Sequence, residues 1–271
     1  LQDSSRTFVA EFDFSDFFGS ISHSYLEAQL DRNGFMVGRD DRKVISAFLK
    51  SNGERGIPQG TSISLFLANM VCWDLDKKLE RCGVKFARYA DDTVVWSPDY
   101  ARICEAFTCI DDFSREVGVK INLSKSAGIS LLKRKGMPAE MVAKEKIDFL
   151  GYSLSVGGVS IKSAAVTKIK AQISYILSKH LLQPLRKKPL KALVIPANNR
   201  DRSLISAMSE IRRYLYGGLT SVQILNYIHG KTRRIYFKGL MSYYPLITDA
   251  EQLKELDGWL VSAVHHAVRA R

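Results

Sequence analysis

Four aspartates stand at two points of the sequence where their carboxylates could do chemistry. Asp13 and Asp16 end a segment rich in aromatic and apolar residues, and Asp91 and Asp92 lie side by side later in the chain. Carboxylate oxygens are ligands of Mg²⁺, for which a protein usually supplies only one or two beside water and phosphate. Two such ions could activate an attacking hydroxyl and stabilise a departing pyrophosphate. The pattern therefore predicts nucleotidyl-transfer chemistry.

Both aspartate groups follow or interrupt segments that are predicted to be strands. Residues 8–14 alternate and carry aromatic and apolar side chains, and residues 84–97 favour two strands folded about Asp91 and Asp92. Adjacent aspartates are more often exposed turn residues that accept local backbone hydrogen bonds. Here the strands would place the aspartate side chains beside the hydrophobic core. Such placement costs folding free energy unless cations or hydrogen-bond donors compensate the carboxylates. This placement favours a functional site.

Hydrophobic periodicity supplies the other elements of the first part of the chain. Apolar residues at three-to-four spacing predict helices over 40–49, 64–79 and 103–117. Residues 119–129 are a predicted strand that carries Lys125, and residues 147–159 are a predicted hairpin that closes at Gly157 and Gly158. We therefore expect a mixed α+β domain over residues 1–160.

The rest of the chain differs in both periodicity and charge. Helices are predicted over 163–182, 203–216, 222–243 and 251–269, with a basic, proline-containing linker around 184–202. Residues 160–271 hold 19 Lys and Arg against 6 Asp and Glu, whereas residues 1–100 hold 12 against 15. We expect a helical, basic domain over 161–271, suited to a phosphate backbone, beside a domain whose carboxylates hold cations.

Apolar runs and cysteines narrow the class of protein further. The longest apolar runs fall well short of the roughly 18 residues needed to cross a bilayer, so no membrane partner is expected. The four cysteines form no CxxC pair and have no histidine at metal-ligand spacing, which argues against a zinc site and a disulfide framework. A cytoplasmic protein with reduced thiols is expected.

Five segments, in order along the chain, resemble the motifs of reverse transcriptases. They are Asp13-Phe-Ser-Asp-Phe-Phe-Gly-Ser-Ile21 (the first catalytic motif), Gly56-Ile-Pro-Gln-Gly-Thr-Ser-Ile-Ser64 (the PQG motif), Tyr89-Ala-Asp-Asp92 (the YxDD motif), Asn122-Leu-Ser-Lys125 (the lysine-bearing motif) and Phe149-Leu-Gly-Tyr152 (the primer-grip hairpin). The resemblance is nearest to the bacterial group that includes group II intron, retron and phage-defence enzymes. It implies a palm, an antiparallel sheet with packed helices, followed by an all-helical thumb.

The resemblance assigns roles to the acidic residues and to one lysine. It implies that Asp13 and Asp91 bridge two Mg²⁺ ions, for which Mn²⁺ could substitute, and that Asp92 supports the catalytic ion. The backbone carbonyl of Phe14 would complete the nucleotide-bound ion. Lys125 would approach the pyrophosphate leaving group as a general acid or as a positive charge.

The same motif that begins at Asp13 implies contacts with the incoming nucleotide. Asp16 and Phe17 would lie under the triphosphate, mainly through backbone amides. Phe18 occupies the steric-gate position, where a ring leaves no room for a 2′-hydroxyl. The resemblance therefore implies deoxynucleotide substrates and argues against an RNA-synthesising polymerase.

The PQG segment would bring a loop to the nucleotide and template. Gln59 would lie beside both, with Gly56 and Gly60 allowing close approach of the backbone. This chain has Ser64-Leu65 where bacterial relatives usually continue with Ser-Pro. The departure favours the divergent defence-associated lineages, so an antiphage role is expected.

Contacts with nucleic acid are expected in the second half of the chain. Cations recur there beside Tyr214, Tyr216 and Tyr236, as in a groove that grips a primer–template duplex by its backbone. The alternative is that Tyr214 and Tyr236 are core residues and the cations are solvated. The predicted contact residues are Gly151, Tyr152, Lys168, Arg212, Arg213, Arg233 and Arg234.

These features together predict an RNA-directed DNA polymerase with an RNA template, a dedicated noncoding RNA among the candidates, and a DNA primer. An untemplated or self-primed DNA polymerase would keep the same carboxylates, and the sequence leaves both open. A non-catalytic, maturase-like RNA-binding protein is less favoured, since an idle site has no reason to keep three converging carboxylates. The fingers region that precedes the first motif in the family is missing here, so we expect it from a preceding segment or another chain.

Overall fold

The structure, a computed structural model, describes residues 6–32, 36–124, 126, 128–134, 136–186, 201–236 and 238–270. The chain divides into two compact units, residues 1–145 and 146–271. Both contain helices, and the strands are mostly antiparallel, so the α+β class is confirmed. In the described part of the chain, no helix is long and apolar enough to cross a membrane.

A five-stranded sheet in the order β3-β4-β1-β6-β7 forms the centre of the first unit. Its strands are β1 (Thr7–Phe12), β3 (Lys85–Tyr89), β4 (Asp92–Ser97), β6 (Ile129–Leu132) and β7 (Ala143–Lys144), antiparallel except for the β6–β7 pair. The alternation of β1 turns Phe8, Ala10 and Phe12 toward one face, where they join the hydrophobic core. The central strand is therefore fixed in register by burial.

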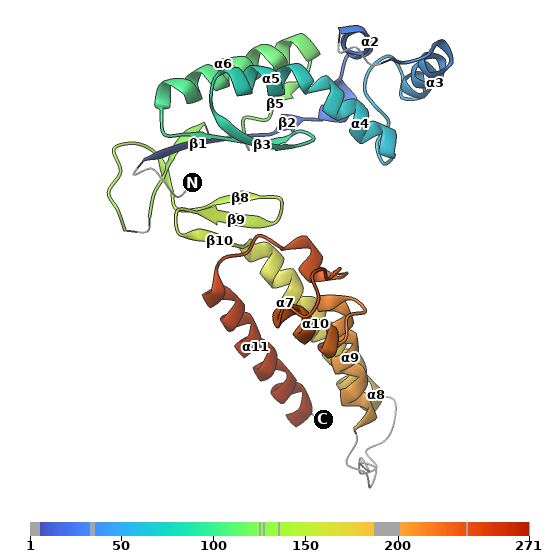
Figure 1. Ribbon diagram of the computed structural model, residues 1–271, viewed down its shortest axis with the longest axis vertical. Helices are drawn as coiled ribbons and strands as arrows, with labels where there is room; N and C mark the ends of the chain where they lie inside the picture. The colour runs from blue at the N-terminus through green and yellow to red at the C-terminus, as the bar shows by residue number, and fades with distance from the viewer. Residues whose placement is uncertain are drawn as a thin grey trace. The chain divides into compact units, whose positions relative to one another are not determined.

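Helices cover that face of the sheet and build the core against it. α5 (Trp73–Arg81) and α6 (Tyr100–Val117) lie across β1, β3 and β4 (Figure 1). α6 begins where Asp99 accepts a hydrogen bond from the backbone of Ala101, and it ends at Gly118 in a left-handed conformation. The unit also contains α1 (Phe17–Ser20), α2 (His23–Arg32), α3 (Arg39–Lys50) and α4 (Ser62–Val71).

Two predicted elements of this unit are wrong in detail. The helix expected over 64–79 is two helices, α4 and α5, which meet at Cys72. In the described part of 119–129, the expected strand is replaced by β5 (Lys120–Ile121), which pairs with β2 (Phe14–Ser15), and by the first residue of β6. β5 ends because the Asn122 side chain accepts hydrogen bonds from the amide and hydroxyl of Ser124, which turns the chain.

The second unit begins with a three-stranded sheet where a two-stranded hairpin was predicted. Its strands are β8 (Ile147–Phe149), β9 (Tyr152–Ser155) and β10 (Gly158–Ile161), all antiparallel neighbours. The additional turn uses left-handed conformations at Leu150, with φ 49°, and Gly151, with φ 84°. This additional turn was not predicted because it contains a single glycine, Gly151, whereas the predicted turn has the pair Gly157 and Gly158.

Helices of the second unit pack around a separate hydrophobic core. They are α7 (Ser163–Leu177), the π-helix η1 (Ser178–Leu182), α8 (Gln183–Arg186), α9 (Arg202–Tyr216), α10 (Ser221–Ile228), the 3₁₀-helix η2 (Leu240–Tyr243) and α11 (Ala250–Arg269). The helix predicted over 222–243 is wrong, because α10 ends where the amide of Lys231 bonds back to the Asn226 carbonyl and Gly230 is left-handed. Most of the linker predicted around 184–202 lies outside the described residues.

The boundary between the units falls before the three-stranded sheet, at residues 145 and 146, and not near residue 160. Side chains near the start of α11 bond to this sheet. Thr248 accepts from the amide of Val159 at 2.9 Å, and the Gln252 side chain accepts from the amide of Ile161 at 2.7 Å and donates to its carbonyl at 2.9 Å. These bonds group the sheet with the helices.

Candidate active site

The register of the central sheet brings the predicted carboxylates to one end of it. β1 and β4 are antiparallel, and their ladder ends with Phe12 opposite Thr93. Asp13 follows the first of these residues and Asp92 precedes the second, so both stand at the same sheet end. Asp91 lies in the turn that joins β3 to β4. Asp13 is therefore brought to the same sheet end as Asp91 and Asp92, which are distant from it in sequence.

Asp13 is held by the segment that contains the lysine-bearing motif. The side-chain amide of Asn122 donates to Asp13 Oδ2 at 3.0 Å, and the backbone amide of Asn122 donates to the Asp13 carbonyl at 2.8 Å. The Asp13 amide donates to Ser126 Oγ at 3.3 Å. Sequence reasoning did not single out Asn122 or Ser126, although both lie within or beside a segment that it quoted. Lys125 itself lies outside the described residues.

The turn formed by Tyr89–Asp92, the carboxylate turn, has an unusual backbone. Ala90 is left-handed, with φ 55°, and is 6% exposed. A left-handed alanine costs about 1–2 kcal/mol and persists only where its surroundings fix it. The neighbouring Arg88 donates a hydrogen bond to the Ala90 carbonyl at 3.0 Å. Sequence reasoning missed this arginine, whose only signal was its place directly before the motif.

The residues predicted to lie under the triphosphate form the start of a short helix. Asp16 is left-handed, with φ 43°, and precedes α1. A Cβ at Gly19 would lie 2.4 Å from Asp16 Oδ2, so a larger residue there would require the Asp16 side chain to move. Phe17 is buried and stacks on Phe14 with ring centroids 5.6 Å apart. Core burial of these two rings therefore fixes the chain that follows Asp13.

Phe18 and the PQG loop are directly joined. Phe18 is half-buried, and its ring meets that of Phe17 edge to face at 5.6 Å. The Ile57 amide donates to the Phe18 carbonyl at 2.6 Å, and the Gly56 amide donates to the Ile21 carbonyl at 2.8 Å. His23 Nε2 also donates to the carbonyl of Gly56 at 2.7 Å. The steric-gate position is therefore fixed to the loop that carries Gln59.

The two glycines of this loop have different requirements. A Cβ at Gly56, where φ is 86°, would lie 2.7 Å from the Gly19 carbonyl oxygen and 2.8 Å from that of Phe18. Glycine is therefore required at Gly56 by the packing of the loop. At Gly60 no atom of the described residues lies within 4 Å of the Cβ position, and glycine is favoured only by φ of 90°. The approach of this backbone to a nucleotide stays a prediction. Gln59 is exposed.

The chemistry of this site fits hard divalent cations. Among the residues that the structure describes, no group of three or more His, Cys, Asp and Glu side chains could hold a metal ion. Mg²⁺ needs only one or two protein carboxylates when phosphates and waters complete its coordination. Asp13, Asp91 and Asp92 are half-buried and offer oxygen ligands at one sheet end, which fits that requirement.

In the second unit most of the predicted contact residues are exposed, and Gly151 and Tyr152 are half-buried. Tyr152 donates to the Tyr243 carbonyl at 2.8 Å, and its ring meets Tyr244 edge to face. Tyr214 is half-buried against the core, where burial raises the pKa of its hydroxyl, whereas Tyr236 is 73% exposed. The core alternative thus applies to Tyr214 and not to Tyr236. The exposed cations are Lys168, Arg212, Arg213, Arg233 and Arg234.

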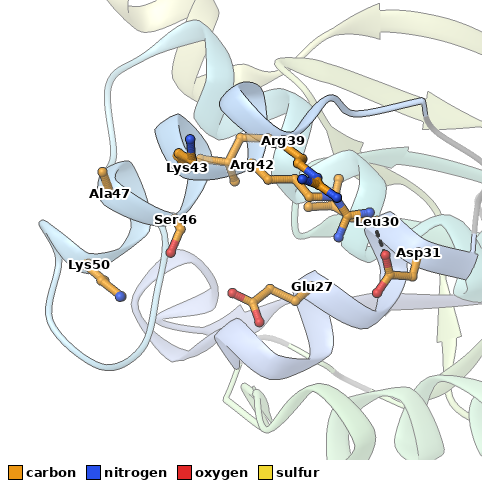
Figure 2. A pocket seen from close by; sticks show the side chains of 10 residues that line it. Glu27, Leu30, Asp31, Arg39, Arg42, Lys43, Ser46, Ala47 and Lys50 are labelled. Carbon is orange, nitrogen blue, oxygen red and sulfur yellow. Dashed lines mark hydrogen bonds and ion pairs between the residues drawn. The ribbon is translucent and has the colours of Figure 1, made fainter.

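Two pockets among the described residues of the first unit lie away from these predicted residues. One of 580 Å³ is formed between α2 and α3 (Figure 2) and includes the Arg42–Asp31 ion pair. Its lining is Glu27, Leu30, Asp31, Arg39, Arg42, Lys43, Ile45, Ser46, Ala47 and Lys50. Another of 390 Å³ is lined by Gly83, Lys85, Trp96, Ser97, Pro98, Asp99 and Arg102. No predicted site residue lines either one.

The chain is similar to parts of larger proteins of known structure. Among solved structures the chain is similar to telomerase from Candida albicans in complex with a fragment of telomeric RNA, at 11% identity, with a TM-score of 0.47 and coverage of 96% of this chain and 47% of that one. It is also similar to a foamy viral protease-reverse transcriptase in complex with double-stranded DNA, at 16% identity, with a TM-score of 0.40 and coverage of 96% and 42%. The chain thus spans less than half the length of these proteins.

A family model described as reverse transcriptase (RNA-dependent DNA polymerase) matches residues 1–154, more than half of the chain. The match contains the sheet end with its three carboxylates, the Gly56–Gly60 loop and Asn122. The chain belongs to the reverse transcriptase family.

Proposed function

We propose that this chain is an RNA-directed DNA polymerase that adds deoxynucleotides with the help of two Mg²⁺ ions. The observation that carries the proposal is the antiparallel register that sets Asp13 beside Asp92, with Asp91 in the adjoining turn. Membership of the reverse transcriptase family supports the reaction class. Carboxylate oxygens at one sheet end are the kind of ligand that such ions take, one or two for each ion beside phosphate and water.

The proposed ligands are Asp13 and Asp91 for both ions, Asp92 as support for the catalytic ion, and the Phe14 carbonyl for the nucleotide-bound ion. β2 and β5 pair Phe14 with Ile121, and the flanking bond joins the Asn122 amide to the Asp13 carbonyl. In such a non-hydrogen-bonded pair the carbonyl of Phe14 faces away from β5. The ions would polarise the attacking hydroxyl and neutralise the charge on the departing pyrophosphate.

The chain's own residues would select and orient the nucleotide. Phe18 is the proposed steric gate, and its bond with Ile57 holds it beside the loop of Gln59 and Gly60. Backbone amides after Asp16, with Phe17 anchored in the core, would face the triphosphate. We retain Lys125 as the proposed group near the leaving pyrophosphate.

The nucleic-acid partners are proposed to be an RNA template and a DNA primer. The exposed cations of the second unit support this proposal, since phosphate contacts supply most non-specific affinity. Tyr236, which is largely exposed between basic segments, could stack on a base. Tyr152 and Gly151 keep their proposed place beside the primer.

We further propose that the chain belongs to the bacterial group and acts in antiphage defence in the cytoplasm. The Ser64-Leu65 departure supports the defence lineage, and the described cysteines are all free thiols, as in a reducing compartment.

Sequencing the DNA that the full-length protein makes would distinguish templated from untemplated synthesis. A DNA product that copies a co-purifying RNA would support templated synthesis. A homopolymer product would show that the protein is an untemplated DNA polymerase instead.

The metal site is tested by Asp91→Ala in a primer-extension assay with an RNA template. We expect extension to be abolished while binding of the primer–template stays within about twofold, because the carboxylate serves the ions and not the duplex. Asp40→Ala is the control, since that side chain lies in the same unit and is 93% exposed. Synthesis that persists in Asp91→Ala would refute the site.

The gate is tested by Phe18→Ala with deoxynucleotides and ribonucleotides in competition. Removing the ring should raise relative ribonucleotide incorporation by about 10-fold or more, since the lost discrimination is steric. Unchanged discrimination would refute the assignment of Phe18.

A further inference from the structure

Arg88, which directly precedes Tyr89 of the carboxylate turn, donates hydrogen bonds from three nitrogens of its side chain. Its Nε and Nη2 atoms donate to the two carboxylate oxygens of Asp76 at 2.8 and 2.6 Å. The arginine side chain is 7% exposed and the aspartate 25%. Burial lowers the pKa of Arg88, but the hydrogen bonds and charge of Asp76 outweigh it, so the pKa lies above its ordinary value. Arg88 therefore stays charged and faces the Asp76 carboxylate.

The remaining nitrogen of the guanidinium reaches two other elements. Nη1 donates to Asn69 Oδ1 at 3.0 Å and to the Ala90 carbonyl at 3.0 Å. Asn69 lies on α4, the helix that follows the PQG loop, and Asp76 lies on α5. One planar group thus joins two helices to the carboxylate turn.

The bond to Ala90 acts at the strained residue that precedes the first aspartate of the pair. The Ala90 carbonyl belongs to the peptide unit that links it to Asp91, so its direction sets the orientation of the next residue. Nearby, burial raises the pKa of the Cys72 thiol to about 12, with further effects from the charges of Arg88, Asp76 and Asp91.

We propose that Arg88 is a positioning residue for nucleotidyl transfer: held by Asp76 and Asn69, it fixes the Ala90–Asp91 peptide and thereby aims the Asp91 carboxylate at the metal site. This inference rests on the proposed function. Its charge is matched by Asp76, so it acts through the hydrogen bond to the turn and not by neutralising the metal ligands. A lysine could keep the ion pair but not the planar fork that reaches all three partners.

The competing explanation is that Arg88 only stabilises the fold. The variant Arg88→Met/Asp76→Leu separates the two, because it removes both charges and leaves neither buried without its partner. Such apolar replacement of a buried pair is often neutral for stability. Arg88→Lys is the second variant, and it keeps the ion pair. Both lose the bond that orients the carboxylate turn.

Three measurements are made on the full chain. Urea unfolding monitors stability, single-turnover deoxynucleotide incorporation is measured against Mg²⁺ concentration, and hydrogen exchange followed by mass spectrometry monitors the amides of residues 90–92. We expect the double variant to unfold near the wild-type midpoint. Its maximal rate at saturating Mg²⁺ should fall by about 100-fold, the effect of a misplacement near 1 Å. Its rate should also respond less strongly to added Mg²⁺. Exchange in the turn should rise by about 10-fold, as for one lost hydrogen bond.

Wild-type incorporation, Mg²⁺ response and turn exchange in the double variant would overturn the proposal. If the double variant fails to fold, Arg88→Lys provides the test. A wild-type incorporation rate and wild-type exchange in Arg88→Lys would also overturn the proposal. A wild-type chain that makes no DNA would refute the proposed function instead. In that case only the hydrogen exchange of residues 90–92 would test the positioning role, and wild-type exchange in the variants would overturn it.

Discussion

Replacing Gly56 with alanine should weaken the first unit more than any other glycine substitution in its loop. Gly56 has φ of 86°, and an added Cβ would meet the carbonyl oxygens of Gly19 at 2.7 Å and Phe18 at 2.8 Å. Both contacts are to backbone atoms, so neither can be relieved by a side-chain rotation. The loop would have to move away from α1.

The size of the effect follows from what that movement breaks. A left-handed alanine costs about 1–2 kcal/mol, offset by about 0.4–1 kcal/mol because alanine restricts the unfolded chain. The loop would also lose the bonds from Gly56 to Ile21 and from Ile57 to Phe18, each worth about 1 kcal/mol. We expect Gly56→Ala to lower the free energy of unfolding by about 3 kcal/mol.

Gly53→Ala is a matched control in the same loop. Gly53 has a similar φ of 99°, but no atom of the described residues lies within 4 Å of its Cβ position. It should lose only about 1 kcal/mol, the backbone part of the effect. The comparison between the two variants therefore isolates the close approach at Gly56.

Urea unfolding followed by tryptophan fluorescence measures this difference. Trp73 and Trp96 lie in the first unit and Trp259 in the second, so a Trp259→Phe background confines the signal to the unit concerned. Primer extension in parallel should show an activity loss on the order of 100-fold for Gly56→Ala, since the loop is bonded to Phe18. Equal destabilisation by Gly56→Ala and Gly53→Ala would refute the close-approach argument.

Three further predictions concern other contacts. Asn122→Ala should lower incorporation at limiting Mg²⁺ by about 10-fold, because its amide no longer orients the Asp13 carboxylate; an unchanged Mg²⁺ titration would contradict this. Tyr152→Phe removes the bond to the Tyr243 carbonyl and should cost about 0.5–1.5 kcal/mol in urea unfolding, whereas no loss would mean that this bond adds nothing. For primer–template binding, replacing Arg233 with glutamine should reduce the slope of log affinity against log salt by about 1, and an unchanged slope in fluorescence anisotropy would exclude a phosphate contact.

Local patterns were enough to predict the elements that place the carboxylates. The alternation of residues 8–14 and the two strands around the aspartate pair predicted a sheet end with acid, and β1, β3 and β4 are found there. Periodicity also predicted α3, α6, α9 and α11 closely. It failed over 64–79, 119–129 and 222–243, where Cys72, the Asn122 side chain and the Asn226 carbonyl end elements through local bonds that apolar spacing does not record.

The sequence by itself determined the chemical groups of this protein: which carboxylates, which ring and which loop stand in an order typical of reverse transcriptases. Only the tertiary structure decided how they are held. Asn122 against Asp13, Arg88 against the carboxylate turn and Gly56 against α1 depend on contacts between segments distant in sequence or on backbone conformation. Residue types indicate which hydrogen bonds are possible. Which segments pair across a sheet or between helices is determined by burial of the whole core, and a local sequence pattern does not contain that information.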